Sequence, residues 1–150
     1  MTTRLAKPLL FASALECEEA FYEALQAGDA DAVADLWLDD GDVCCVHPGR
    51  PRLLGHAAIK ASWAAILNGG PLRVRVAARK VVETPTLTMH NLVEEVVVVH
   101  EREQQLVHVI ATNAYVKTPA GWKMVLHHGS PVAGGQAEDI EIEERAGRLH

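Results

Sequence analysis

The fold of this chain is decided by its last clear strand, which reads Gly121-Trp122-Lys123-Met124-Val125-Leu126-His127-His128-Gly129-Ser130-Pro131. Because side chains alternate along a strand, the even-numbered residues from Trp122 to His128 share one face, and the three before His128 favour burial. We therefore predict that the strand brings His128 to one end of the core. A slip of one residue near Gly129 would turn His127 inward instead.

A histidine at the end of a buried strand face is a candidate functional group, because its ring titrates near neutral pH and can act as acid, base or ligand. A second one, His47, lies in the segment Val46-His47-Pro48-Gly49. If His47 and His128 meet in space, together they indicate a site. The alternative is that His128 only forms hydrogen bonds at the end of its strand.

The composition is that of one folded domain. The chain has 150 residues, of which 49% are hydrophobic and 23% charged, which allows a sizeable core and argues against disorder. The formal net charge of −6 argues against nucleic acid as the main partner. No apolar run is long enough to span a bilayer, so we expect no membrane partner.

The cysteines and the first residues favour a cytoplasmic protein. Cys17, Cys44 and Cys45 make an odd count with two adjacent, which fits reduced thiols better than a disulfide framework. The apolar segment at residues 9–12 is too short, and the sequence after Ala14 too acidic, for a signal peptide.

Three helices are expected in the first half of the chain. Ser13 and Glu16 form a capping box for the first helix, and Gly28 ends it. Asp29 caps a short second helix, and a third helix follows Gly55. The apolar stripe of the first helix comprises Ala14, Cys17, Phe21, Ala24 and Leu25.

From Pro71 onward the hydrophobic period changes to two, which indicates strands. Strands are predicted at residues 72–79, 92–100, 106–117 and from 122, with a hairpin turn at 118–121. We predict an α+β domain at residues 13–132, with three N-terminal helices packed in the concave face of a curved, mostly antiparallel sheet. This cone has a cavity at its open end. Residues 1–12 are an N-terminal extension, and 133–150 an acidic C-terminal tail.

A resemblance to a known family is spread over most of residues 15–131. It rests on the order and spacing of four segments: residues 21–29, residues 36–40, Cys45-Val46-His47-Pro48-Gly49 with Leu54-Gly55, and residues 121–130. Together they resemble the SnoaL-like branch of the nuclear transport factor 2 and ketosteroid isomerase superfamily. The resemblance implies a cone-shaped, cystatin-like roll, a pocket between sheet and helices, and frequent homodimers. It does not imply one reaction.

The steroid isomerase mechanism can be compared with this sequence residue by residue. That chemistry needs a carboxylate base, and a tyrosine with a protonated aspartic acid to hold the oxyanion. The resemblance places Phe21 at the tyrosine position, with Tyr22 one residue away. It places His47 at the base position and Asn113 at the oxyanion position. We therefore do not expect ketosteroid isomerase activity.

The candidate site combines the residues that these arguments single out. His47, His128 and Asn113 are the candidate catalytic residues. The candidate ligand-binding residues are Tyr22, Trp63, His127 and Phe21. Either of the adjacent acids Glu94 and Glu95 would be a candidate base if it pointed inward. Cys45 and His47 share a strand face, but no second ligand pair supports a metal site, so we expect no metal and no cofactor.

Two functions remain open. One is a protein that binds a small apolar or weakly polar molecule and catalyses cofactor-free isomerisation, cyclisation or dehydration. The other is a non-catalytic homodimeric module with a vestigial pocket. Dimerisation through the sheet is expected in both cases, because residues 92–117 are apolar on both strand faces and helices can cover only one.

Overall fold

The computed structural model describes residues 10–132, and within them it confirms the predicted α+β architecture. Helix α1 spans Ala14–Ala27, α2 spans Ala30–Leu36, and α3 spans His56–Leu67. The strands are β1 (Cys44–Val46), β2 (Arg52–Leu54), β3 (Val74–Glu83), β4 (Leu87–His100), β5 (Glu103–Thr118) and β6 (Gly121–Pro131). The predicted N-terminal extension and acidic tail lie almost wholly outside the described residues.

The helix signals that the sequence contains are confirmed. The Ser13 hydroxyl accepts a hydrogen bond from the Glu16 amide, and the Asp29 carboxylate caps α2 by accepting from Ala32 N. Gly28 ends α1 with φ of 70°, in the left-handed region that glycine adopts without strain. These caps set the boundaries of the helix that later positions the site.

The six strands form one open sheet in the order β2-β1-β6-β5-β4-β3. All neighbouring pairs are antiparallel except β1 and β6, which are parallel. The two short strands β1 and β2 lie between α2 and α3 in the sequence. Strand β4 begins five residues earlier than predicted, at Leu87, because residues 84–86 form a tight hairpin with β3.

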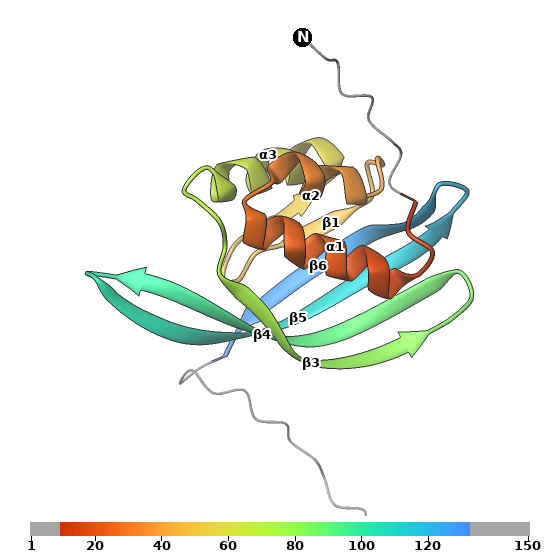
Figure 1. Ribbon diagram of the computed structural model, residues 1–150. Coiled ribbons are helices and arrows are strands. Elements are labelled where there is room, and N and C mark those ends of the chain that lie inside the picture. Colours follow the sequence, from red (N-terminus) through yellow and green to blue (C-terminus); the bar gives the residue numbers. More distant parts are fainter. Residues whose placement is uncertain (1–9, 133–150) are drawn as a thin grey trace, which may run out of the picture.

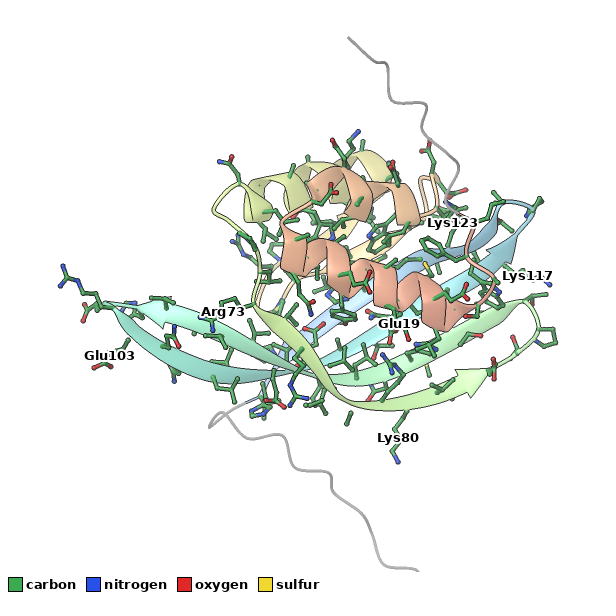
Figure 2. The ribbon with its side chains drawn as sticks, in the orientation of Figure 1. Glu19, Arg73, Lys80, Glu103, Lys117 and Lys123 are labelled. Carbon is green, nitrogen blue, oxygen red and sulfur yellow. The ribbon has the colours of Figure 1, made fainter. Side chains whose placement is uncertain are left out.

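The helices cover the concave face of the curved sheet, with α1 lying across its middle (Figure 1). The core between the two layers contains the buried stripe of α1, Trp37 at the end of α2, and inward residues of the sheet, including Leu92, Tyr115 and Met124. Lys80 projects from the side of β3 that faces away from the helices (Figure 2). No helix among residues 10–132 is both long enough and apolar enough to cross a membrane.

A β-bulge in β6 overturns the prediction that His128 faces the core. Tyr115 pairs with Met124 and Ala114 pairs with Leu126, so Val125 has no partner on β5. The extra residue shifts the alternation by one, as bulges do. Beyond it the odd-numbered residues point inward: His127 is 3% exposed and buried, whereas His128 is exposed. The slip that would turn His127 inward does occur, but at Val125 instead of Gly129.

Candidate functional site

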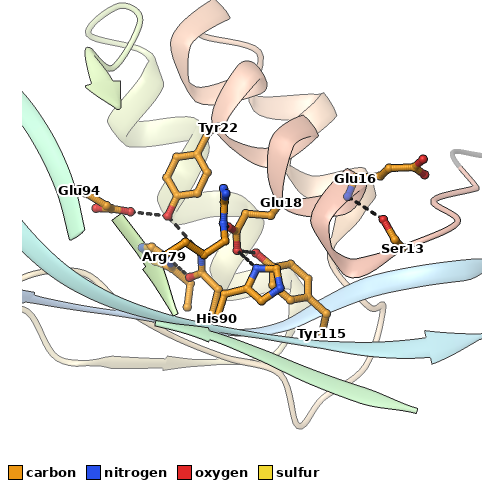
Figure 3. A network of polar contacts seen from close by, with 10 residues as sticks. Ser13, Glu16, Glu18, Tyr22, Arg79, His90, Glu94 and Tyr115 are labelled. Carbon is orange, nitrogen blue, oxygen red and sulfur yellow. Dashed lines mark hydrogen bonds and ion pairs between the residues drawn. The ribbon is translucent and has the colours of Figure 1, made fainter. Parts of the chain in front are cut away.

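Helix α1 brings two polar side chains to its buried face. Glu18 and Tyr22 are four residues apart, so they lie one helical turn apart above the sheet. Glu18 is completely buried and Tyr22 is 5% exposed. Each one contacts polar side chains that rise from the sheet, and this produces two adjacent hydrogen-bonded clusters (Figure 3).

The first cluster is a chain of three hydrogen bonds that connects β4 to β6. The Tyr22 hydroxyl donates to Oε2 of Glu94 at 2.5 Å and accepts from Nδ2 of Asn113 at 3.1 Å. Nδ1 of His127 lies 2.6 Å from Oδ1 of the same amide. We call these four residues the Tyr22 chain. All four are buried.

The Tyr22 chain has one consistent direction. Because Nδ2 of Asn113 donates to Tyr22, the other end of the amide is an oxygen, which can only accept. His127 therefore donates from Nδ1, and a neutral ring then has an unprotonated Nε2. Nε2 has no hydrogen-bond partner among the described residues. It is also not one of the fully buried, unbonded side-chain nitrogen and oxygen atoms of those residues.

The two ends of the Tyr22 chain have shifted pKa values. Burial raises the pKa of the Glu94 carboxyl to about 7, although the Tyr22 hydrogen bond opposes the rise. Burial, together with smaller effects of the neighbouring His47 and His128, lowers the pKa of His127 to about 3. At neutral pH the His127 ring is uncharged, and Glu94 is partly protonated and partly ionised.

Glu94 and His127 both line a pocket of about 730 Å³ between the sheet and α3. Most of its wall is apolar, which is typical of small-molecule sites. The lining residues are Leu25, His47, Pro48, Trp63, Ile66, Leu72, Val74, Glu94, Val96, Val98, Gln105, Val107, His108, Val109, His127, Pro131 and Val132.

His47 also lines the pocket, just after β1, the strand that pairs with β6. Its Nε2 lies 2.7 Å from the Ser62 hydroxyl, and its ring packs edge-on against Trp63 with centroids 4.7 Å apart. Burial lowers the pKa of His47, and the charge of Arg50 acts in the same direction. Trp63 also lies 5.8 Å from the His127 ring, so it connects the two histidines.

The second cluster, which we call the Glu18 cluster, lies beside the pocket and does not line it. Glu18 accepts hydrogen bonds from Arg79 Nε at 2.7 Å and Tyr115 Oη at 2.6 Å, and His90 Nδ1 lies 2.6 Å from it. Burial alone would raise the pKa of Glu18, but the contacts with His90, Tyr115 and Arg79 together hold it below its usual value. This cluster joins α1 to β3, β4 and β5.

The two buried thiols, Cys17 and Cys45, offer little reactivity. Burial raises the pKa of Cys45 to about 12, so it stays protonated beside His47. Within residues 10–132, no group of three or more His, Cys, Asp or Glu side chains is arranged to hold a metal ion.

The structure brings some of the predicted site residues together and leaves others apart. His47, Trp63 and His127 line the pocket, while His128 points away from it. Three predicted residues lie behind the pocket wall, namely Phe21, Tyr22 and Asn113. Both ends of the Asn113 amide are already bonded to side chains, and the residue does not line the pocket, so it is not placed to hold an oxyanion there.

Two residues of the site region were missed by the sequence reasoning. Glu18 lies within the apolar stripe of α1, four residues after Ala14, and a charged residue there is itself a signal of a buried polar contact. Ser62, next to Trp63 on α3, gave no signal. Of the two adjacent acids, Glu94 points inward, and Glu95 on the opposite face pairs with Arg75.

The chain belongs to the SnoaL-like domain family, whose model matches residues 15–134. The resemblance read from the sequence is therefore confirmed. No curated protein matches the chain.

Three solved structures illustrate the relationship. One, from Thiobacillus denitrificans ATCC 25259, is provisionally described as a calcium/calmodulin-dependent protein kinase type II association domain. It is 31% identical, with a TM-score of 0.74 over 83% of this chain and 98% of that chain. Another, from Streptomyces avermitilis, is provisionally described as a dehydratase of the NTF2-like family. It is 32% identical, with a TM-score of 0.71 over 79% of this chain and 92% of that chain. An NTF2-like protein with a cystatin-like fold from Novosphingobium aromaticivorans is 22% identical and shares the fold, with a TM-score of 0.62 over 80% and 84%.

Proposed function

We propose that this SnoaL-like protein binds a largely apolar small molecule in its pocket and moves a proton on that molecule without a cofactor. Glu94 is the proposed acid–base group. The observation that supports this most is a single buried carboxyl on an apolar pocket wall, with a pKa of about 7. A base with a pKa near the working pH is the most effective one for proton transfer.

The pocket suits reactions that take a proton from a carbon next to a carbonyl and return it elsewhere. Isomerisation, cyclisation and dehydration all include such a step. Tyr22 holds one oxygen of Glu94, and Oε1 has no hydrogen-bond partner among the described residues. Oε1 is the atom that would receive the proton. The description of the Streptomyces avermitilis protein as a dehydratase agrees with this chemistry.

Deuterium exchange into ketones tests the proposal without knowledge of the natural substrate. The protein is incubated in D2O with apolar ketones of increasing size, from cyclohexanone to tricyclic compounds, and deuterium uptake next to the carbonyl is measured by mass spectrometry. A positioned base should accelerate uptake by about 10²–10⁴-fold over buffer for a ketone that fits.

Glu94→Gln should abolish the acceleration, whereas Glu95→Gln should retain it. Glu95 is the matched control, because it is the next residue on the opposite face of β4 and pairs with Arg75. Uptake at the buffer rate for every ketone would refute the catalytic part of the proposal. Equal rates in the wild type and Glu94→Gln would refute the role of Glu94.

A homodimeric module is the second candidate, and the outer face of the sheet favours it. Val82, Met89, Ala114 and Leu126 are paired across four strands and form one apolar row on the side away from the helices. Val82 is 59% exposed and Met89 is 37% exposed. An apolar row of this kind is typical of an association surface. The Thiobacillus denitrificans protein is described as an association domain.

Sedimentation at micromolar concentration tests self-association through this row. The wild type should sediment as a dimer and Met89→Arg as a monomer. Leu15→Arg is the control, because Leu15 is a 41% exposed apolar residue on α1, which covers the other side of the sheet. A wild-type monomer, or a Met89→Arg dimer, would refute this interface.

A further inference from the structure

We infer that the ligand of the proposed site is uncharged and donates a hydroxyl hydrogen bond to Nε2 of His127. The inference rests on the proposed function, since it concerns the same pocket and names the class of molecule that enters it. It is carried by the direction of the Tyr22 chain and by the charges of the pocket wall.

The first argument is the fixed tautomer of His127. Asn113 uses its amide nitrogen on Tyr22 and its oxygen on Nδ1 of His127, so the ring cannot turn its proton toward the pocket without losing a buried hydrogen bond. The remaining nitrogen, Nε2, is an acceptor on a residue that is 97% buried (3% exposed) and lines the pocket. An acceptor in an apolar wall is satisfied by a ligand that donates.

The second argument is the absence of a positive partner for an anion. Among the lining residues that the structure describes there is no lysine or arginine, and Glu94 is the only acid. The pKa values of His47 and His127 are both lowered, so neither ring supplies a positive charge at neutral pH. The third lining histidine, His108, pairs with Glu95, so its side chain belongs to the outer face of the sheet, opposite to Val109 and Glu94. A carboxylate ligand would lose its hydration and meet the partly ionised Glu94.

The third argument separates a hydroxyl from an ammonium group. A hydroxyl donates one hydrogen bond, which matches the single acceptor at His127. An ammonium group has three donors and a full charge, and all three donors need acceptors once it leaves water. The groups that flank His127 are the rings of Phe21 and Trp63, at centroid distances of 5.3 and 5.8 Å. These rings provide no further acceptor oxygen, so most of the lost hydration of an ammonium group at this end would not be replaced.

Four probes with one apolar skeleton test the inference: methyladamantane, adamantylmethanol, adamantanecarboxylate and adamantylmethylamine. Their dissociation constants are measured at pH 7.5 by titration followed with amide NMR shifts. Adamantylmethanol should bind roughly threefold to tenfold more tightly than methyladamantane, which is the usual contribution of one neutral hydrogen bond. The carboxylate should bind more weakly than the hydrocarbon.

Two variants place the hydroxyl contact. His127→Phe should retain the affinity for methyladamantane and lose the preference for the alcohol. His128→Phe should retain both, because the neighbouring ring points outward from the sheet. The ¹⁵N spectrum of His127 in the unliganded wild type should show a protonated Nδ1 and an unprotonated Nε2.

Several results would overturn the inference. Binding of the hydrocarbon without any gain for the alcohol would leave the pocket in place and remove the hydroxyl contact. A carboxylate or an ammonium probe that binds most tightly would refute the ligand class. An alcohol preference that survives in His127→Phe would refute the contact with His127. Failure of all four probes to bind would refute the pocket itself, and with it the proposed function.

Discussion

Replacing Tyr22 with phenylalanine tests the central contact of the site. The substitution removes one oxygen and little volume, so the packing of α1 on the sheet is retained. It deletes the donor to Oε2 of Glu94 and the acceptor of Asn113 Nδ2. Glu94 then loses the hydrogen bond that stabilises its ionised form, and Asn113 is left with a buried amide proton that has no acceptor.

Both effects can be estimated from the structure. A hydrogen bond to a charged group contributes about 1.5–3 kcal/mol, and one pH unit corresponds to about 1.4 kcal/mol. The protonated carboxyl retains part of this bond, so the pKa of Glu94 should rise from about 7 by about one pH unit. The unsatisfied amide of Asn113 should lower the free energy of unfolding by about 1–3 kcal/mol.

The pKa of Glu94 is measured by ¹³C NMR of its side-chain carboxyl, and the free energy of unfolding by urea denaturation. Tyr115→Phe is the matched control: Tyr115 is also buried and donates to a buried carboxylate, but to Glu18. The control should lower stability as well and leave the pKa of Glu94 in place. An unchanged pKa of Glu94 in Tyr22→Phe, or the same rise in both variants, would refute the reasoning.

Three further predictions concern pH and stability. The folded-state pKa of Glu94 lies above its usual 4.5, so the free energy of unfolding should fall by about 3 kcal/mol as the pH rises from 4.5 to about 7. Urea denaturation should show this fall in the wild type and not in Glu94→Gln. The pKa of His127 lies below its usual 6.5, so the free energy of unfolding should fall by about 5 kcal/mol as the pH drops from 6.5 to about 3. The same fall in His127→Phe over this pH range would contradict the prediction. Glu18→Ala should lower the free energy of unfolding by about 2–6 kcal/mol, because the buried Tyr115 hydroxyl and the buried His90 ring each lose a hydrogen-bond partner. A loss below about 1 kcal/mol would contradict the structural role of the Glu18 cluster.

The elements of the fold could be predicted because their signals are local. The capping box at Ser13, the left-handed Gly28 and the cap at Asp29 each act within one helical turn. Hydrophobic spacing at period two then gave the long strands. The start of β4 was missed because Thr88 and His90 are buried polar residues, which hide the alternation that a strand usually shows.

The facing of the two histidines could not be predicted from the strand alone. Alternation along β6 holds as far as Met124 and fails at Val125, where the register with β5 shifts. A bulge depends on how two strands fit together, and the sequence of one strand does not contain that information. Strict alternation therefore selected His128, and the pairing in the structure selects His127.

The polar core was harder to predict than the apolar core for a related reason. A stripe of apolar residues identifies a buried helix face, and polar residues in the same stripe are then passed over as exceptions. Glu18 and Tyr22 lie in that stripe, and their partners come from strands 61 to 97 residues later in the chain. Asn113 shows the consequence: its position matched a family residue that contacts the substrate. In this chain the same amide contacts two side chains and sets the proton position on His127. A residue that lines no part of the pocket thus decides which hydrogen bond the pocket can offer.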